Sequence, residues 1–257
     1  MKYEILSLYH KHLLKSFSTE TVRVYVGRLD SLLEGQSLTH TLEEWDMEKV
    51  LENLSKIKYK NHFSQSKNAL LYFCAFQNII IESAYLNEIT LLEQNTKRKY
   101  RKLKKVDFAE VEKTIKNLKN QKLKLSYQTI IKTGLRVFEL AQITPKDCYT
   151  SESDILMTFF GKGGKNETVI INKKDDVKFF NKLLNAINNA DPDKKVFYSA
   201  IYLQIKAKEH GFACHDLRRA FAKIEYKKTK SKSHVMEELR HKGLKSTKIY
   251  LRSKVKI

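Results

Sequence analysis

Four side chains near the C-terminus have the types and spacing for chemistry on a phosphodiester. His215 and Arg218 are three residues apart, so on a helix their side chains share one face. His241 follows a short helical pattern, and Tyr250 comes nine residues later. Arginine matches phosphate oxygens, imidazole moves protons near neutral pH, and a phenol can be a covalent nucleophile. The set favours phosphodiester chemistry over acyl transfer.

Each of these residues alone has a simpler interpretation. A single His-x-x-Arg pair usually lies on a solvated helix face, and a tyrosine near a C-terminus usually packs; this chain has 13 tyrosines. A third stretch, at 133–140, strengthens the functional interpretation. There Gly134 is expected to end one helix and let the next begin at once, which places Arg136 in the first turn of that next helix.

In combination, these stretches resemble the motifs of the tyrosine recombinases, also called phage-type integrases. The matching segments are Thr-Gly-Leu-Arg-x-x-Glu-Leu at 133–140, Gly-Lys-Gly-x-Lys at 161–165, His-x-Leu-Arg at 215–218, Leu-x-His at 239–241, and Tyr250. They follow the family's order and separations, and with the N-terminal part they cover nearly the whole chain. Arg240 departs from the pattern, because the family usually has Gly before this histidine. Because of this departure, the motif does not determine the conformation of the turn before His241, and the added cation could reach phosphate.

The resemblance implies a role for each residue of the set. Arg136 and Arg218 would hold the non-bridging phosphate oxygens, and His241 would donate a further hydrogen bond. Tyr250 would attack the phosphorus. His215 would help to take the proton of this tyrosine, because a phenol with a pKa near 10 is protonated at neutral pH.

Two further residues are implied as helpers. Lys162 is the implied general acid that protonates the leaving 5′-hydroxyl, with Lys165 as its rival. Glu139, one turn after Arg136, is expected to hold that arginine or His215 by a charge-assisted hydrogen bond. A surface ion pair is the alternative for Glu139.

The implied function is site-specific recombination of double-stranded DNA through a 3′-phosphotyrosine and a Holliday junction. A homo-tetramer would act on the DNA, and the chain is expected to be a monomer when free in solution. Because the helical region begins almost at Met1, we expect a simple member of the Cre or Xer type. Two alternatives stay open at this point: an enzyme like the type IB topoisomerases, which relaxes DNA, and a DNA-binding module that does not catalyse.

Composition limits the class of partner. The chain carries 49 Lys and Arg against 29 Asp and Glu, a net charge of +20, which favours nucleic acid. No long apolar run or basic amphipathic terminal helix supports a membrane partner. The 3 cysteines lack metal-ligand spacing and indicate reduced thiols in a cytoplasmic protein. Without a glycine-rich nucleotide loop or an acidic metal cluster, we expect no cofactor, neither ATP nor a metal ion.

The expected fold is mainly α with a small β-hairpin or sheet (α+β), comprising an N-terminal helical bundle and a tyrosine-recombinase catalytic domain. Helical periodicity fills 1–94, the expected DNA-binding domain. The basic block within 95–106 is typical of a linker, and 107–257 would be the catalytic domain. The expected DNA contacts are Lys99, Arg101 and Lys102 in the linker, with Arg23 and Lys67 on the bundle.

Four local predictions can be compared directly with a structure. A short fifth helix is expected from Ile79 to Leu91. The β-rich runs 155–160 and 167–172 flank a glycine-rich turn and predict a hairpin, and 196–198 is expected to be a short extended piece. The alternation of Val255 and Ile257 with lysines predicts an added edge strand, on a neighbouring protomer or on the same domain.

Overall fold

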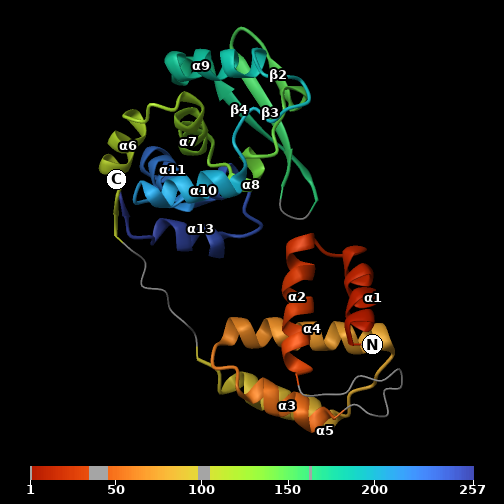
Figure 1. Ribbon diagram of the computed structural model, residues 1–257. Helices are drawn as coiled ribbons and strands as arrows, with labels where there is room; N and C mark the ends of the chain where they lie inside the picture. The colour runs from red at the N-terminus through yellow and green to blue at the C-terminus, as the bar shows by residue number, and fades with distance from the viewer. Residues whose placement is uncertain (1, 35–45, 98–104, 162–163) are drawn as a thin grey trace. The chain divides into compact units, whose positions relative to one another are not determined.

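In the computed structural model of this protein, the described residues are 2–34, 46–97, 105–161 and 164–257. The chain divides into two compact units, Met1–Arg101 and Lys102–Ile257 (Figure 1). Each unit buries its own hydrophobic side chains. The extent of the linker at 95–106 stays a prediction, because most of it lies outside the described residues.

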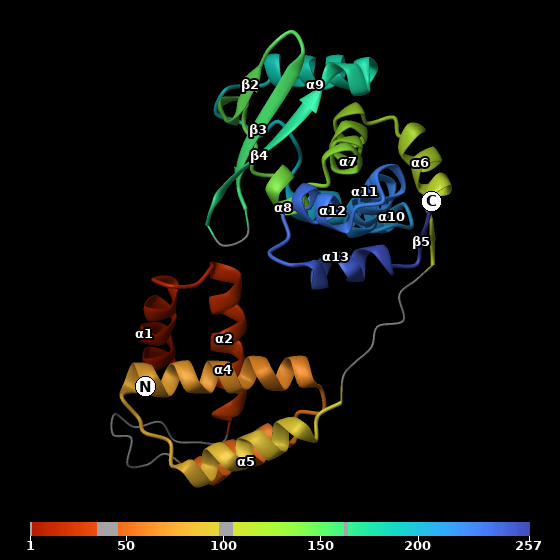
Figure 2. The same cartoon turned by 180° about the vertical axis from the view of Figure 1, so that it is seen from behind.

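The regular elements in the described part of the first unit are helices, apart from an isolated β-bridge between Tyr59 and Lys97. Helices α1 (Lys2–Leu14) and α2 (Thr19–Leu32) lie side by side, and α4 (Lys60–Gln77) crosses both (Figure 2). The shorter α3 (Met47–Ser55) and α5 (Ser83–Gln94) pack on each other. Buried apolar side chains recur every three or four residues along these helices, so each helix turns one face to a common core.

Polar residues set the ends of these helices. Ser18 caps α2, and its Oγ accepts a hydrogen bond from the Thr21 N–H at 3.4 Å. Asn78 ends α4 in the left-handed conformation, with φ 56°. The prediction of a helix from Ile79 is therefore wrong at its start. The chain after Asn78 runs through three β-branched isoleucines without helical structure, and α5 begins only at Ser83.

The second unit combines helices with a small antiparallel sheet, one face of which is buried. Its helices are α6 (Phe108–Lys116), α7 (Gln121–Thr133), α8 (Val137–Leu140), α9 (Val177–Asn188), α10 (Ala200–Glu209), α11 (Cys214–Thr229), α12 (Lys232–Glu238) and α13 (Leu244–Leu251), with short 3-10 turns at Pro145–Asp147 and Lys173–Asp175. Its strands are β1 (Val106–Asp107), β2 (Cys148–Thr150), β3 (Asp154–Phe160), β4 (Asn166–Asn172) and β5 (Val255–Lys256). The expected fold class, mainly α with a small sheet, is confirmed.

The sheet has the strand order β2-β3-β4 and contains the predicted hairpin. Strands β3 and β4 pair from Asp154 with Asn172 to Phe160 with Asn166, one residue longer per strand than predicted. Alternate side chains of both strands are buried and join the same core as α9. Residues 196–198 form no strand, and that prediction is wrong. The Val196 N–H instead donates to the Ile143 carbonyl oxygen at 3.0 Å, which holds this buried segment in an irregular turn.

The end of the chain docks on its own unit. Strand β5 pairs in parallel with β1, with Val255 opposite Val106. Lys223 on α11 holds this segment by donating to the carbonyl oxygens of Ser253 (2.8 Å) and Val255 (2.7 Å). The predicted added strand is confirmed for Val255, which is buried. It is wrong for Ile257, whose side chain is exposed beyond the paired residues.

Candidate active site

The turn between α7 and α8 requires glycine for two reasons. Gly134 ends α7 with φ 62°, a conformation that side chains disfavour. A Cβ at this position would also lie 2.5 Å from a ring carbon of Phe221 on α11. This close approach lets the Gly134 carbonyl oxygen accept a hydrogen bond from Arg218 Nη1. The predicted stop at Gly134 is confirmed, but Arg136 is the N-cap residue of α8 and does not lie in its first turn.

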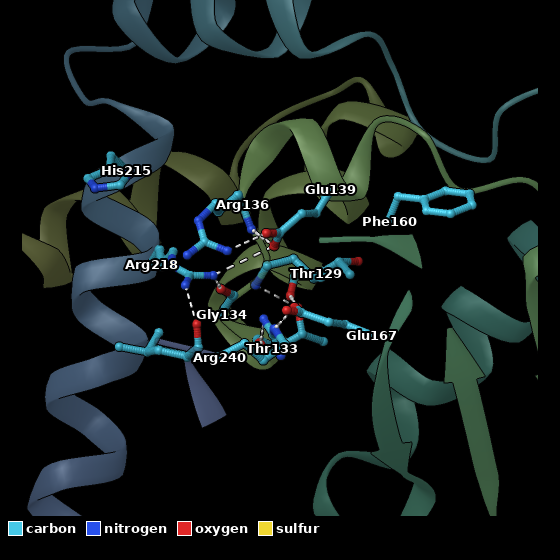
Figure 3. Close-up of polar contacts among 12 residues, drawn as sticks. Thr129, Thr133, Gly134, Arg136, Glu139, Phe160, Glu167, His215, Arg218 and Arg240 are labelled. Carbon is cyan, nitrogen blue, oxygen red and sulfur yellow. Dashed lines mark hydrogen bonds and ion pairs between the residues drawn. The ribbon is translucent and has the colours of Figure 1, made fainter. Parts of the chain in front are cut away.

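Glu139 joins the two arginines of the site (Figure 3). Its carboxylate accepts from the Arg136 backbone N–H at 2.7 Å and from the Arg136 guanidinium. It also lies 3.7 Å from Arg218 Nη1. Glu139 is only 4% exposed, so the alternative of a surface ion pair is wrong. The sequence left open Arg136 or His215 as its partner, and the structure pairs it with Arg136 and adds Arg218.

Arg218 is a buried cation. Its side chain is 1% exposed, and its two terminal nitrogens donate to the carbonyl oxygens of Gly134 and Leu239. Burial, and then the charge of Arg136, lower its pKa to about 10, so it stays charged at neutral pH. Its Nε is buried and has no hydrogen-bond partner among the described residues, which is uncommon for a charged donor. Arg218 thus fixes α11 to the α7–α8 turn and to the end of α12.

Tyr250 on α13 and His215 on α11 form a direct pair. The Tyr250 hydroxyl lies 2.7 Å from His215 Nε2, within hydrogen-bond distance. The Tyr250 ring also contacts His241 edge-on, with ring centroids 4.9 Å apart, and lies 5.9 Å from the guanidinium carbon of Arg218. The two imidazoles, the phenol and a guanidinium that the sequence singled out are therefore gathered at one place.

Thr247 is a member of this group that the sequence did not reveal. It is fully buried on α13, and its Oγ1 lies 2.9 Å from His241 Nδ1. This contact orients the imidazole and leaves Nε2 as the nitrogen for a ligand. The only available signal was spacing, since Thr247 and Tyr250 are three apart and share one helix face.

Both histidines are held in the neutral form. The pKa of His215 is lowered from 6.5 to about 4, first by the protein atoms that surround the ring and then by Arg219 and Arg218, although the residue as a whole is exposed to solvent. Burial, then Arg218 and Arg136, lower the pKa of His241 to about 4 as well. At neutral pH each imidazole can therefore accept a proton, and the fixed positive charge around them comes from arginine.

Open space adjoins these cations. A cavity of about 470 Å³ is lined by Arg136, His215 and Arg218 and by parts of α8, α10 and the start of α11. The Arg136 side chain is 27% exposed, so its guanidinium can reach a ligand without leaving Glu139. A guanidinium pair beside a neutral imidazole is suited to an anion such as a phosphate group.

The remaining candidate residues are placed as follows. Lys162 lies outside the described residues. Lys165 is exposed directly before β4, and its carbonyl oxygen accepts a hydrogen bond from the Gly161 N–H at 2.8 Å. Arg240 does not extend toward the cavity, because its guanidinium packs over the Phe159 ring at 5.4 Å. A contact of this cation with phosphate stays a prediction.

The proposed DNA contacts of the first unit have protein partners. Arg23 is exposed and pairs with Glu20 at 2.8 Å, and Lys67 pairs with the partly buried Glu93. Lys99, Arg101 and Lys102 lie outside the described residues. Their contacts with DNA stay predictions.

Other classes of site find no support in the described part of the chain. Within the described ranges, no group of three or more His, Cys, Asp or Glu side chains could hold a metal ion. All three cysteines are free thiols. None of the helices in the described part of the chain is both long and apolar enough to cross a membrane.

Solved structures with a similar fold include several recombinases. XerH site-specific recombinase bound to difH substrate is 19% identical, with a TM-score of 0.60 over 90% of this chain and 77% of that one. A lambda integrase dimer bound to a COC′ core site is 17% identical, with a TM-score of 0.68 over 99% and 98%. The Tn1549 transposon integrase in complex with transposon right end DNA is 16% identical, with a TM-score of 0.60 over 96% and 94%. At these identities the likeness shows the fold.

Among curated protein sequences, none matches this chain. The Phage integrase family matches residues 104–256, which span the second unit from just before β1 to β5 and include every residue of the site described above. The match covers more than half of the chain, so this protein belongs to the phage integrase family.

Proposed function

We propose that this chain is a site-specific DNA recombinase, which cleaves and rejoins double-stranded DNA through a 3′-phosphotyrosine and a Holliday junction. The observation that carries the proposal is the 2.7 Å contact between the Tyr250 hydroxyl and Nε2 of a neutral His215. A phenol beside a neutral imidazole, with two arginines close by, is prepared to become a nucleophile toward an anionic ester.

In the proposed cleavage step, His215 Nε2 accepts the proton of Tyr250 and the phenolic oxygen attacks phosphorus. One P–O bond forms to the tyrosine, and the P–O bond to the 5′ oxygen breaks. The leaving oxygen takes a proton, for which we propose Lys162 as the acid. The bond energy is kept in the phosphotyrosine, so the 5′-hydroxyl of a partner strand can reverse the step without a nucleotide cofactor.

The arginines have the electrostatic role. Charge accumulates on the non-bridging oxygens during attack, and preorganised cations stabilise that charge more than they stabilise the ground state. Arg136 is the more exposed of the two and is proposed to bind these oxygens directly. Arg218 is proposed to add positive potential from its buried position, and its Nε has no partner among the described residues. His241 is proposed to donate a hydrogen bond to the phosphate through Nε2, because its Nδ1 faces Thr247.

Recombination also requires assembly. A lambda integrase tetramer bound to a Holliday junction shares the fold of this chain, with a TM-score of 0.67 and 15% identity over 99% of this chain and 78% of that one. By analogy, we propose a homo-tetramer on DNA formed from protomers that are monomeric in solution. Lys99, Arg101 and Lys102 are proposed to contact DNA phosphates where the linker crosses the duplex.

A covalent capture experiment tests the function and identifies the target sequence at the same time. The protein is mixed with a library of nicked duplexes of random sequence, and covalent protein–DNA adducts are recovered after denaturation and sequenced. The proposal expects one enriched sequence, and two duplexes of that sequence should exchange strands through a four-way junction. Capture without sequence preference, together with relaxation of supercoiled plasmid and no junction, would assign the chain to the topoisomerase-like class instead.

A further inference from the structure

Arg240 occupies a position whose backbone favours glycine. Helix α12 ends in a Schellman motif, in which the Arg240 N–H donates to Glu237 O (2.8 Å) and the His241 N–H to Met236 O (3.0 Å). The motif puts Arg240 in the left-handed region, with φ 53°. Such a conformation costs free energy for any residue with a Cβ, and it persists where the surroundings hold it.

Contacts of the Arg240 side chain hold the residue in this conformation. The side chain is 13% exposed, lies over the Phe159 ring on β3, and donates weakly to the Thr133 carbonyl oxygen at 3.5 Å. Its Nε lies 3.4 Å from Glu167 Oε2 on β4; both residues are drawn in Figure 3. Each of these two atoms is buried and has no hydrogen-bond partner among the described residues, so the ion pair compensates both charges in part, and Glu139 also contributes to the compensation of Arg240.

Glu167 lies at the base of the hairpin turn. It is directly opposite Phe159 in the β3–β4 ladder. A Cβ added at Gly161 would meet the Glu167 carboxylate at 2.5 Å, so the absence of a side chain at Gly161 makes room for that carboxylate. The Gly161 N–H closes the turn on the Lys165 carbonyl oxygen, and Gln142 ties the Phe160 carbonyl oxygen at 3.0 Å. The hairpin base is thus fastened from both strands.

We propose that Arg240 and Glu167 are positioning residues that fix the base of the β3–β4 hairpin to the turn that carries His241. Residue 240 directly precedes His241, and Gly161 directly precedes Lys162. The ion pair therefore connects the segment that leads into His241 with the strand pair that leads into Lys162. This inference rests on the proposed function, because it acts through the general acid on the hairpin.

The test uses the duplex sequence captured by the full-length protein, made with either oxygen or sulfur at the bridging 5′ position. A thiolate leaving group needs no proton, so it bypasses a general acid that is out of place. Arg240→Gly and Glu167→Gln should each slow adduct formation on the oxygen duplex about 10- to 100-fold, the range for a misplaced catalytic group. On the sulfur duplex both variants should come within about threefold of the wild type.

Two controls keep the test specific. Lys230 is another non-glycine residue with positive φ (54°), at the end of α11, so Lys230→Gly relieves the same backbone strain away from the hairpin. It should leave both rates unchanged. Arg240→Lys keeps the charge and should recover part of the rate on the oxygen duplex. The sulfur-to-oxygen ratio is measured on one preparation, so a lower active fraction does not alter it.

The outcomes separate this inference from the proposed function. Equal losses on both duplexes, or no loss, would overturn the positioning role of Arg240 and Glu167 while the wild type still forms its adduct. A wild type that forms no adduct with any duplex would overturn the proposed function, and with it the inference.

Discussion

The sharpest test of the charge arrangement is the substitution Glu139→Gln. Glu139 is almost fully buried and compensates Arg136 and Arg218 together. Glutamine keeps nearly the same shape and one acceptor oxygen, but it removes the negative charge and leaves the buried Arg218 uncompensated. Removing one partner of a buried pair costs about 3–5 kcal/mol. We take about 3 kcal/mol, because Arg136 is partly solvated and can be rehydrated.

This loss is large enough to measure by thermal unfolding. In a domain of this size 1 kcal/mol corresponds to about 2–4 °C in Tm, so the variant should melt about 6–12 °C below the wild type. The circular dichroism of the helices should report the transition, since the single tryptophan lies outside the second unit. Added duplex DNA should restore part of the loss, because a bound phosphate supplies the missing negative charge.

A matched control separates burial from charge. Glu112→Gln removes a carboxylate that lies 3.6 Å from Lys116 on the exposed face of α6, with about half of the glutamate side chain exposed. An exposed pair contributes about 0–1 kcal/mol, so this variant should melt close to the wild type. If Glu139→Gln melts no lower than Glu112→Gln, the carboxylate does not hold the two arginines and the account of their positioning fails.

Three further predictions concern the proposed general acid, the two histidines and the basic linker. Lys162→Ala should slow cleavage severely and be rescued by a 5′-thiolate leaving group; rescue of Lys165→Ala instead would move the acid role to the second lysine. Between pH 6.5 and about 4, both histidines are protonated in the unfolded chain but stay neutral in the folded one. The free energy of unfolding should therefore decrease as the pH falls through this range. His241→Gln should flatten this fall in urea unfolding measured at several pH values, and an unchanged slope would mean that His241 titrates normally. Neutralising Lys99, Arg101 and Lys102 together should reduce the slope of log binding constant against log salt concentration by about 1 per lost phosphate contact, without changing the preferred DNA sequence. A changed sequence preference with an unchanged slope would indicate that these residues contact bases.

The parts of the fold that depend on neighbouring residues were predictable from the sequence. Helical spacing located the helices, the glycine-rich turn between two β-rich runs located the hairpin, and Gly134 located the end of α7. The misses at this level are local as well. Asn78 takes the left-handed conformation that stops α4 before the isoleucines. Arg136, two residues after the left-handed Gly134, is the N-cap of α8 and does not lie in its first turn.

The contacts between distant segments were not predictable, because no spacing encodes them. The spacing of Glu139 indicated Arg136, but its second partner, Arg218, comes from another helix. The period of the C-terminal tail indicated a strand, but not that Val106 would pair with it. The packing partners of Arg240 were not predictable either, because Phe159 and Glu167 come close to Arg240 only when β3 and β4 form the hairpin.

The nucleophile can be identified by the mass of the peptide that carries DNA after covalent capture. The wild type and Tyr250→Phe are each incubated with the captured duplex, digested with nuclease and protease, and the modified peptide is sequenced by mass spectrometry. The phenylalanine keeps the ring packed against α11 and α12 and loses only the hydroxyl. If Tyr250 is the nucleophile, the wild type should carry a nucleotide on Tyr250, and Tyr250→Phe should form no adduct although it binds DNA nearly as well. An adduct formed by the variant, or a nucleotide on Tyr226, Tyr198 or Tyr202, would contradict it.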